Sequence, residues 1–235
     1  AVLLLVALYI VRMLGLFMVL PVLMLAGTDY THSNVFLQGV ALGIYGLTQA
    51  CLQIPFGILS DRFGRKRLII IGLIIFAFGS VLAATADSIQ GLIVGRALQG
   101  AGAIAGVIMA MVGEMTSNET RTKAMATIGA SIGVAFALSL VVGPLLTAAG
   151  GVRWIFWLTL VLSVVAIGIV IWLVPPENQN DRHRLVSLEG LRQVTTDMDL
   201  FRLNFGIFML HAVLMSLFVA LPLVLQTINI PPAQH

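Results

Sequence analysis

Seven long apolar runs, separated by short polar segments, dominate the pattern of residues along the chain. Each run is long enough to cross about 30 Å of hydrocarbon as a helix that rises about 1.5 Å per residue. The runs are continuously apolar and lack the alternation of transmembrane β-strands, so helices are expected. The sequence therefore predicts seven transmembrane helices, at residues 2–26, 35–59, 68–86, 89–112, 124–148, 154–174 and 200–228.

The longest polar stretch, residues 175–199, begins with Pro175 and Pro176, a pair that ends a helix. It carries charges of both signs, which is typical of a solvated segment. We therefore expect three parts: a six-helix membrane bundle at residues 1–174, a cytoplasmic linker at 175–199, and the first helix of a second, truncated bundle at 200–235.

Composition supports the membrane interpretation. The chain has 59% hydrophobic and only 10% charged residues, whereas about a quarter of the residues of a soluble domain are charged. The formal charge of +3 does not indicate nucleic-acid binding, because no folded water-facing domain is available to carry a basic patch. Cys51 is the single cysteine, which excludes an internal disulfide and a thiolate metal cage. We expect the lipid bilayer as a partner and no metal or other cofactor.

The positions of lysine and arginine predict the orientation, because cytoplasmic loops carry the positive excess. Arg153 stands alone on one side of the predicted spans, against ten basic residues on the other. The amino terminus and the loops after the second, fourth and sixth spans are therefore expected in the cytoplasm of a cell whose inner membrane holds the chain. The ten are Arg62, Arg65, Lys66, Arg67, Arg121, Lys123, Arg182, Arg184, Arg192 and Arg202.

The segment after the second run, residues 57–66, combines two glycines, an acid and several bases. Gly57 and Gly64 permit close helix approach and a tight reversal. Asp61 can accept hydrogen bonds from free backbone N–H groups and favours the positive end of a neighbouring helix dipole. Arginines keep their charge and can clamp carboxylates at two points; the alternative is that the bases only determine topology. The basic members are Arg62, Arg65 and Lys66.

This loop resembles the motif of the major facilitator superfamily, glycine-x-leucine-small-aspartate-basic-x-glycine-basic-basic, at every defining position. The resemblance implies an all-α integral membrane fold whose six-helix bundle is a 3+3 inverted repeat. It implies that the loop is a conformational switch in which Glu114, at the end of the fourth span, partners the loop's arginine. The alternative for Glu114 is a solvated carboxylate at a helix end.

Two further segments resemble motifs of this family. Residues 96–103, RALQGAGA, are similar to the fourth-helix motif, whose arginine is thought to take part in substrate or proton handling. Gly143 and Pro144 are similar to the helix-bend motif of members that export by antiport. Ser139 stands where that motif usually has a glycine, and the Gly150-Gly151 pair lies a few residues late, so the direction of transport stays open.

Arg12 and Arg96 are charges inside apolar runs, at related positions of the first and fourth spans, as an internal repeat would place them. An arginine near a helix centre costs about 2.5–3.5 kcal/mol on insertion. In the functional interpretation, the two arginines bind a polar or anionic substrate group or perturb a nearby titrating carboxyl. In the structural interpretation, they pair with backbone carbonyls and glutamines and so fix helix packing. The glutamines of this candidate substrate and proton pathway are Gln49, Gln53 and Gln99.

Glycines at four-residue spacing let membrane helices approach closely, and we interpret them as packing positions. The pairs are Gly39/Gly43, Gly91/Gly95, Gly102/Gly106 and Gly129/Gly133.

The leading functional hypothesis is a secondary transporter that exports small molecules in exchange for protons by alternating access. An intramembrane enzyme is disfavoured because no H-E-x-x-H motif is present. Residues 129–133, GASIG, match G-x-S-x-G, but they lie inside an apolar run and not at the strand-to-helix turn that a nucleophilic serine of this motif requires. A non-transporting seven-helix scaffold or receptor-like protein is the other alternative, and the Asp61 loop and the linker argue against it. Because members of the family have twelve spans in two halves, we expect either carboxy-terminal helices or a second copy of the chain as a partner.

Overall fold

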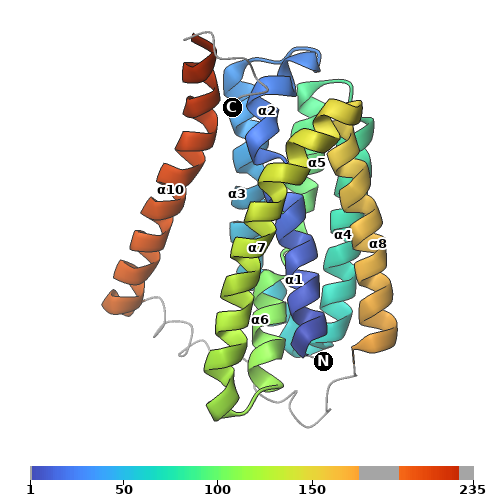
Figure 1. Cartoon of the computed structure of the whole chain (residues 1–235). Helices are drawn as coiled ribbons and strands as arrows, with labels where there is room; N and C mark the ends of the chain where they lie inside the picture. Colours follow the sequence, from blue (N-terminus) through green and yellow to red (C-terminus); the bar gives the residue numbers. More distant parts are fainter. Residues whose placement is uncertain (1, 175–195, 228–235) are drawn as a thin grey trace.

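The computed structural model describes residues 2–174 and 196–227, which form an elongated bundle of helices (Figure 1). Seven spans in this part of the chain are long and apolar enough to cross a membrane, which confirms the predicted number. The helices are α1 (Val2–Phe17), α2 (Leu20–Ala26), α3 (Val35–Phe63), α4 (Arg65–Thr85), α5 (Ile89–Ala101), α6 (Ala105–Glu114), α7 (Asn118–Gly150), α8 (Arg153–Leu173) and α10 (Met198–Thr227), with a short 3-10 turn η1 (Gly27–Asp29) after α2.

The bundle has two ends that differ in charge. The basic end carries residues 62–67 and 121–123, and the opposite end carries residues 27–34, 86–88 and 150–153. Between them α4 packs against both α5 and α8, α3 packs against α5, and α1 packs against α7 and α8. The linker predicted at 175–199 lies almost entirely outside the described residues, so the division of the chain into domains stays a prediction.

Local sequence signals explain where several helices begin. The side chain of Asn34 accepts a hydrogen bond from the backbone N–H of Leu37 at the start of α3, and Ser88 does the same for Gly91 at the start of α5. Gly64 ends α3 and begins α4 with a φ of 94°, a conformation that favours glycine. The tight reversal expected at Gly64 is therefore present.

Two of the seven spans are broken, although the sequence pattern predicts each as one helix. The first span breaks between α1 and α2, where Pro21 provides no backbone donor. The fourth span breaks between α5 and α6 without a proline. There the N–H groups of Ala103 and Ile104 donate only two residues back, to Ala101 and Gly102. A Cβ at Gly102 would collide with the carbonyl of Gly72 on α4, so the break lies at a close contact between backbones.

The glycine pairs divide into two groups. A Cβ at Gly95 would lie 2.6 Å from the backbone nitrogen of Ala83, and Gly102 and Gly106 also face close neighbours. By contrast, a Cβ at Gly39, Gly43, Gly129 or Gly133 would meet nothing within 4 Å. For these two pairs, on α3 and α7, the packing interpretation is wrong within the described residues.

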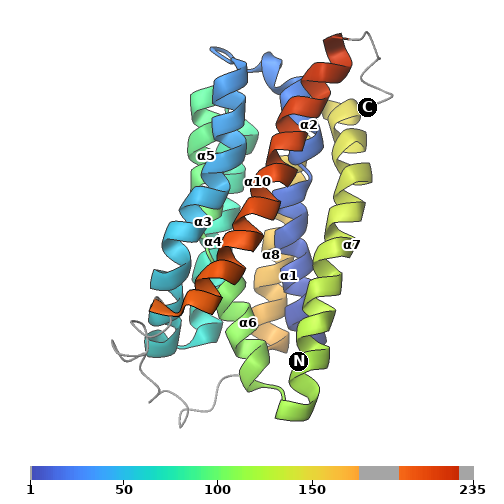
Figure 2. The ribbon, with the colours of Figure 1, turned by 90° about the vertical axis from the view of Figure 1, so that its left-hand side faces the viewer.

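Helix α10 rests on the bundle at one end only. It packs against α2, and Figure 1 shows its other end diverging from the remaining helices, while Figure 2 shows it crossing in front of the bundle. Phe218 of α10 meets the ring of Phe136 on α7 edge to face at 5.9 Å, and Phe136 meets Phe17 of α1 in the same way at 5.2 Å. This row of three aromatic rings joins α1, α7 and α10.

The orientation in the membrane is testable by cysteine labelling. In a Cys51→Ser background, we expect a cysteine at the exposed His32 to react with a membrane-impermeant maleimide added outside intact cells. A cysteine at the exposed Thr122 should react only after the membrane is opened. Ser60 is unsuitable as a labelling position because its side chain is buried. Labelling of both positions from outside would contradict the orientation derived from the basic loops.

Candidate functional site

The junction of α3 and α4 and the end of α6 bring together three residues of the predicted conformational switch. The guanidinium of Arg65 lies 3.2 Å from the carboxylate of Asp61 and 2.6 Å from that of Glu114, at the end of α6. Arg65 thus joins three helices at the basic end of the bundle. Arg62 is exposed and lies over the ring of Phe63 at 5.5 Å. At Gly57 a Cβ would meet nothing within 4 Å, so the helix approach expected there is not made within the described residues.

Lys66 has a structural role that the sequence did not indicate. Its ammonium donates hydrogen bonds to the backbone carbonyls of Ile171 and Val174, at 2.9 and 2.6 Å. These carbonyls belong to the last turn of α8 and its end, where backbone acceptors lack helical partners. Arg121 likewise donates to the carbonyl of Gly113 at the end of α6. Both cations cap helix termini, in addition to any effect that they have on topology.

The first buried arginine, Arg12, lies on α1 and is 1% exposed. One terminal nitrogen, Nη2, donates to Oε1 of Gln49 on α3 at 3.0 Å. The guanidinium lies over two aromatic rings, those of Tyr45 at 5.7 Å and Phe76 at 5.3 Å. Its Nε and Nη1 have no hydrogen-bond partner among the residues that the structure describes.

The second buried arginine, Arg96 on α5, is completely inaccessible. Its Nη1 donates to Oε1 of Gln99 at 3.0 Å, and the guanidinium lies 4.6 Å from the centre of the Tyr45 ring. Longer contacts reach the carbonyls of Ala41 and Gly15 at 3.4 and 3.5 Å. The two arginines therefore meet at one tyrosine, which comes from α3.

A chain of neutral hydrogen bonds extends this cluster toward α8. Gln99 donates to the hydroxyl of Ser80 on α4 at 2.8 Å, and Thr159 of α8 lies 3.2 Å from the same hydroxyl. Sequence reasoning found Gln49 and Gln99 but missed Tyr45, Ser80 and Thr159, because single polar residues in apolar runs resemble packing positions. The spacing of Tyr45 four residues before Gln49 was the available signal, since both then share one face of α3.

Gln53 does not join this cluster. Its amide lies against Gly106 of α6, where a Cβ would come within 2.6 Å of its Nε2. Its Oε1 is buried and has no hydrogen-bond partner in the described parts of the chain. Gln53 therefore belongs to the contact between α3 and α6.

Gly143 and Pro144 lie inside the continuous helix α7. A Cβ at Gly143 would lie 2.5 Å from the carbonyl oxygen of Met18, the residue that follows α1 at the break in the first span. The helix-bend motif thus permits α7 to approach this break closely.

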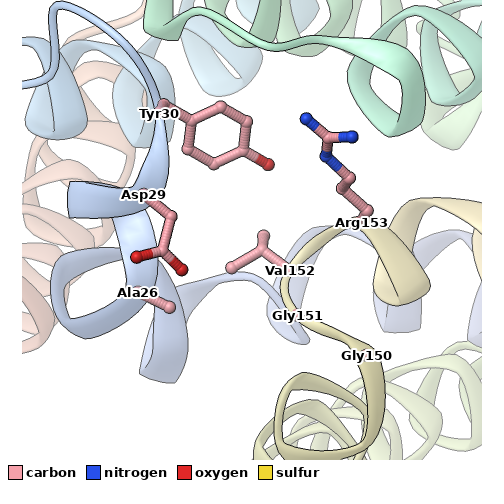
Figure 3. A pocket seen from close by; sticks show the side chains of 7 residues that line it. All are labelled: Ala26, Asp29, Tyr30, Gly150, Gly151, Val152 and Arg153. Carbon is pink, nitrogen blue, oxygen red and sulfur yellow. The ribbon is translucent and has the colours of Figure 1, made fainter.

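The end of the bundle opposite the basic loops is held by a separate set of contacts. Arg153 forms an ion pair with Asp87 at 2.6 Å, and Thr31 exchanges backbone hydrogen bonds with Asp87 and Ile89. Beside them lies an open pocket of about 250 Å³, into which Tyr30 projects between Asp29 and Arg153 (Figure 3). Burial raises the pKa of Tyr30 from its usual value near 10 to about 12. The pocket is lined by Ala26, Asp29, Tyr30, Gly150, Gly151, Val152 and Arg153.

The described residues contain no group of three or more histidines, cysteines, aspartates or glutamates placed to hold a metal ion.

Comparison with known proteins places this arrangement in a family. The sequence profile of the Major Facilitator Superfamily matches residues 5–234, almost the whole chain. The chain belongs to the major facilitator superfamily. This confirms the resemblance of the loop at 57–66 and the expected all-helical fold, and it makes the chain a multi-pass membrane protein.

Relatives in the superfamily include the inner membrane transport protein YajR of Escherichia coli. It is 49% identical over 226 residues, which cover 95% of this chain and 50% of YajR. An uncharacterized transporter of Buchnera aphidicola is 41% identical over 217 residues, covering 91% of this chain and 56% of the relative. The chain thus spans about half the length of these curated relatives.

The fold also resembles a solved superfamily structure, that of the human organic anion transporter MFSD10. The TM-score is 0.61, with 20% sequence identity, and the match covers 75% of this chain and 47% of the human protein. At this identity the likeness supports the fold alone.

Proposed function

We propose that this chain forms one bundle of a secondary transporter that exports small molecules in exchange for protons by alternating access. The observation that carries the proposal is the cluster of Arg12, Arg96 and Tyr45. Its charged donors lie inside an apolar bundle, and several of them have no partner among the residues that the structure describes. Ionisable groups inside membrane bundles are rare and mark pathways for substrates and ions. Export is supported by the resemblance of Gly143 and Pro144 to the antiporter motif, and proton coupling by the same resemblance.

Alternating access needs a second bundle, against which this one can rock. The faces of α3 and α7 support such a partner, because Gly39, Gly43, Gly129 and Gly133 have nothing within 4 Å in the described residues. Small residues on an exposed face let another membrane helix approach closely. The partner helices would come from further residues of the same polypeptide or from a second copy. The complete unit is called the assembled transporter below.

The Asp61 loop would act as the conformational switch of this unit. Arg65 lies between Asp61 and Glu114, so a change in the position or protonation of either carboxylate alters the balance between the two ion pairs. All acidic residues in the described ranges lie at helix ends or connections, away from Arg12 and Arg96.

A proteoliposome assay tests the function. Vesicles with the assembled transporter and a pH-sensitive dye in the lumen should show proton movement on addition of at least one compound from a panel of small molecules. Asp61→Asn should remove most of this flux, because it weakens the contact with Arg65. The 235-residue chain alone should show no such flux, since a single bundle cannot alternately close both sides. Robust coupled flux from the short chain would contradict this expectation and would indicate that a second copy supplies the second bundle, as a functional homodimer.

A further inference from the structure

The buried arginines carry charges that no acid neutralises within the described structure. Ion pairs in the described residues occur only near the helix ends, and none of them includes Arg12 or Arg96. The partners of the two arginines are neutral: side-chain oxygens of Gln49 and Gln99 and backbone carbonyls. A buried ion without a counter-ion is strongly disfavoured, even when neutral groups accept some of its hydrogen bonds.

The unsatisfied donors are concentrated around one aromatic ring. Nε and Nη1 of Arg12, Nη2 of Arg96 and the hydroxyl of Tyr45 are all buried and without partners in the described part of the chain. Both guanidiniums lie within 6 Å of the centre of the Tyr45 ring. These donors come from α1, α5 and α3, so helix packing itself assembles them at one place.

The chemistry of this cluster selects one class of ligand. A cation would add to two positive charges, and a neutral molecule would leave them unneutralised. An oxyanion supplies negative charge together with several acceptor lone pairs, and guanidinium groups form their strongest hydrogen bonds with carboxylates and phosphates. Tyr45 and Phe76 add aromatic faces beside the charged donors.

We propose that Arg12, Arg96 and Tyr45 form a binding site for an oxyanion group, such as a carboxylate, on the molecule that the protein transports. This proposal rests on the proposed function and specifies the substrate class of the same site. The negative group replaces the missing counter-ion, and the arginines hold it by charge-assisted hydrogen bonds. The arginines are therefore specificity residues for anionic compounds.

Three probes of the same shape and different charge test the site. The 235-residue chain, purified in detergent at fixed ionic strength, is titrated with benzoate, benzamide or benzamidine, and the thermal unfolding midpoint is followed. Benzoate should raise the midpoint in a saturable way, because a ligand that binds only the folded state stabilises it. Benzamide and benzamidine should have at least tenfold weaker effects. Sodium chloride in place of benzoate tests whether a small inorganic anion suffices.

Matched variants locate the effect. Arg12→Gln and Arg96→Gln should each weaken the apparent affinity for benzoate at least tenfold, whereas Arg67→Gln, at an exposed position on α4, should leave it unchanged. Arg96→Lys keeps the charge with fewer donors and should retain part of the affinity for benzoate. This partial retention would show that the glutamine variant loses binding and not the fold. Equal stabilisation by benzoate and chloride, or benzoate binding that survives both glutamine variants, would overturn the proposal.

Transport separates this proposal from the proposed function. If the assembled transporter moves compounds that benzamidine competes with and benzoate does not, the oxyanion assignment is wrong while the transport function stands. If benzoate binds through Arg12 and Arg96 but no compound of the panel is moved, the site stands and the transport function is wrong. Competition by benzoate that Arg96→Gln abolishes would support both.

Discussion

Replacing Gly95 by leucine should prevent the six-helix bundle from folding. A Cβ at this position would lie 2.6 Å from the backbone nitrogen of Ala83 and 2.9 Å from its Cα. On the facing helix, a Cβ at Gly79 would lie 2.5 Å from the backbone nitrogen of Gln99. Two glycines thus let α4 and α5 cross with their backbones in contact, and neither backbone can move aside as a flexible side chain would.

The expected loss in the free energy of unfolding exceeds the roughly 1–3 kcal/mol that overpacking of a core usually costs, because a whole side chain must enter the contact between α4 and α5. The measurement is the monodisperse fraction and the unfolding midpoint of the 235-residue chain in detergent. Gly43→Leu is the matched control: it places the same side chain in the middle of α3, where a Cβ meets nothing within 4 Å. Equal yields and midpoints for the two variants would show that the α4–α5 contact is looser than described.

Replacing Arg96 by alanine should abolish transport by the assembled transporter and leave its fold largely intact. The side chain is fully buried and makes its short hydrogen bond to a neutral partner, Gln99. Its removal therefore relieves a buried charge that no acid compensates in the described structure, although Gln99 loses one hydrogen bond. The guanidinium that lies over the Tyr45 ring from α5 is lost at the same time.

The test compares coupled flux in proteoliposomes with the unfolding midpoint of the same preparations. Arg67→Ala serves as the control, because Arg67 is an exposed arginine at the basic end and lies outside the buried cluster. We expect less than one tenth of the normal flux for Arg96→Ala and a normal flux for Arg67→Ala. Near-normal transport by Arg96→Ala at an unchanged midpoint would reassign Arg96 to helix packing.

The number of spans was predictable because lipid requires long apolar helices, and the pattern of residues records this directly. The apolar pattern does not show the breaks in two spans, and only the first of them has a local signal, Pro21. Pro55 and Pro144 lie inside continuous helices, whereas the fourth span breaks without a proline. Its break lies where the backbone of Gly102 meets Gly72 of another helix, which is a tertiary contact that no local signal encodes.

The candidate site was predictable in its charged members and less so in its neutral ones. The cost of placing arginine in lipid singled out Arg12 and Arg96, and charge complementarity together with the family resemblance singled out Arg65 and Glu114. Tyr45 was missed because an isolated tyrosine in an apolar run has no evident cost. Glycine spacing identified helix faces that can be approached closely, but it could not say which faces this chain fills and which it leaves open.

Both ends of helix α8 are held by contacts with residues that come much earlier in the chain. Arg153 at its start pairs with Asp87, 66 positions before it, and its final carbonyls accept from Lys66, 105 and 108 positions before them. A ribosome makes the chain from the amino terminus, so neither fastening can form until the sixth span has been synthesised. During biogenesis Lys66 and Asp87 therefore lack these contacts while the first five spans are in the membrane. The contacts at both ends of α8 form only after α8 itself has been inserted.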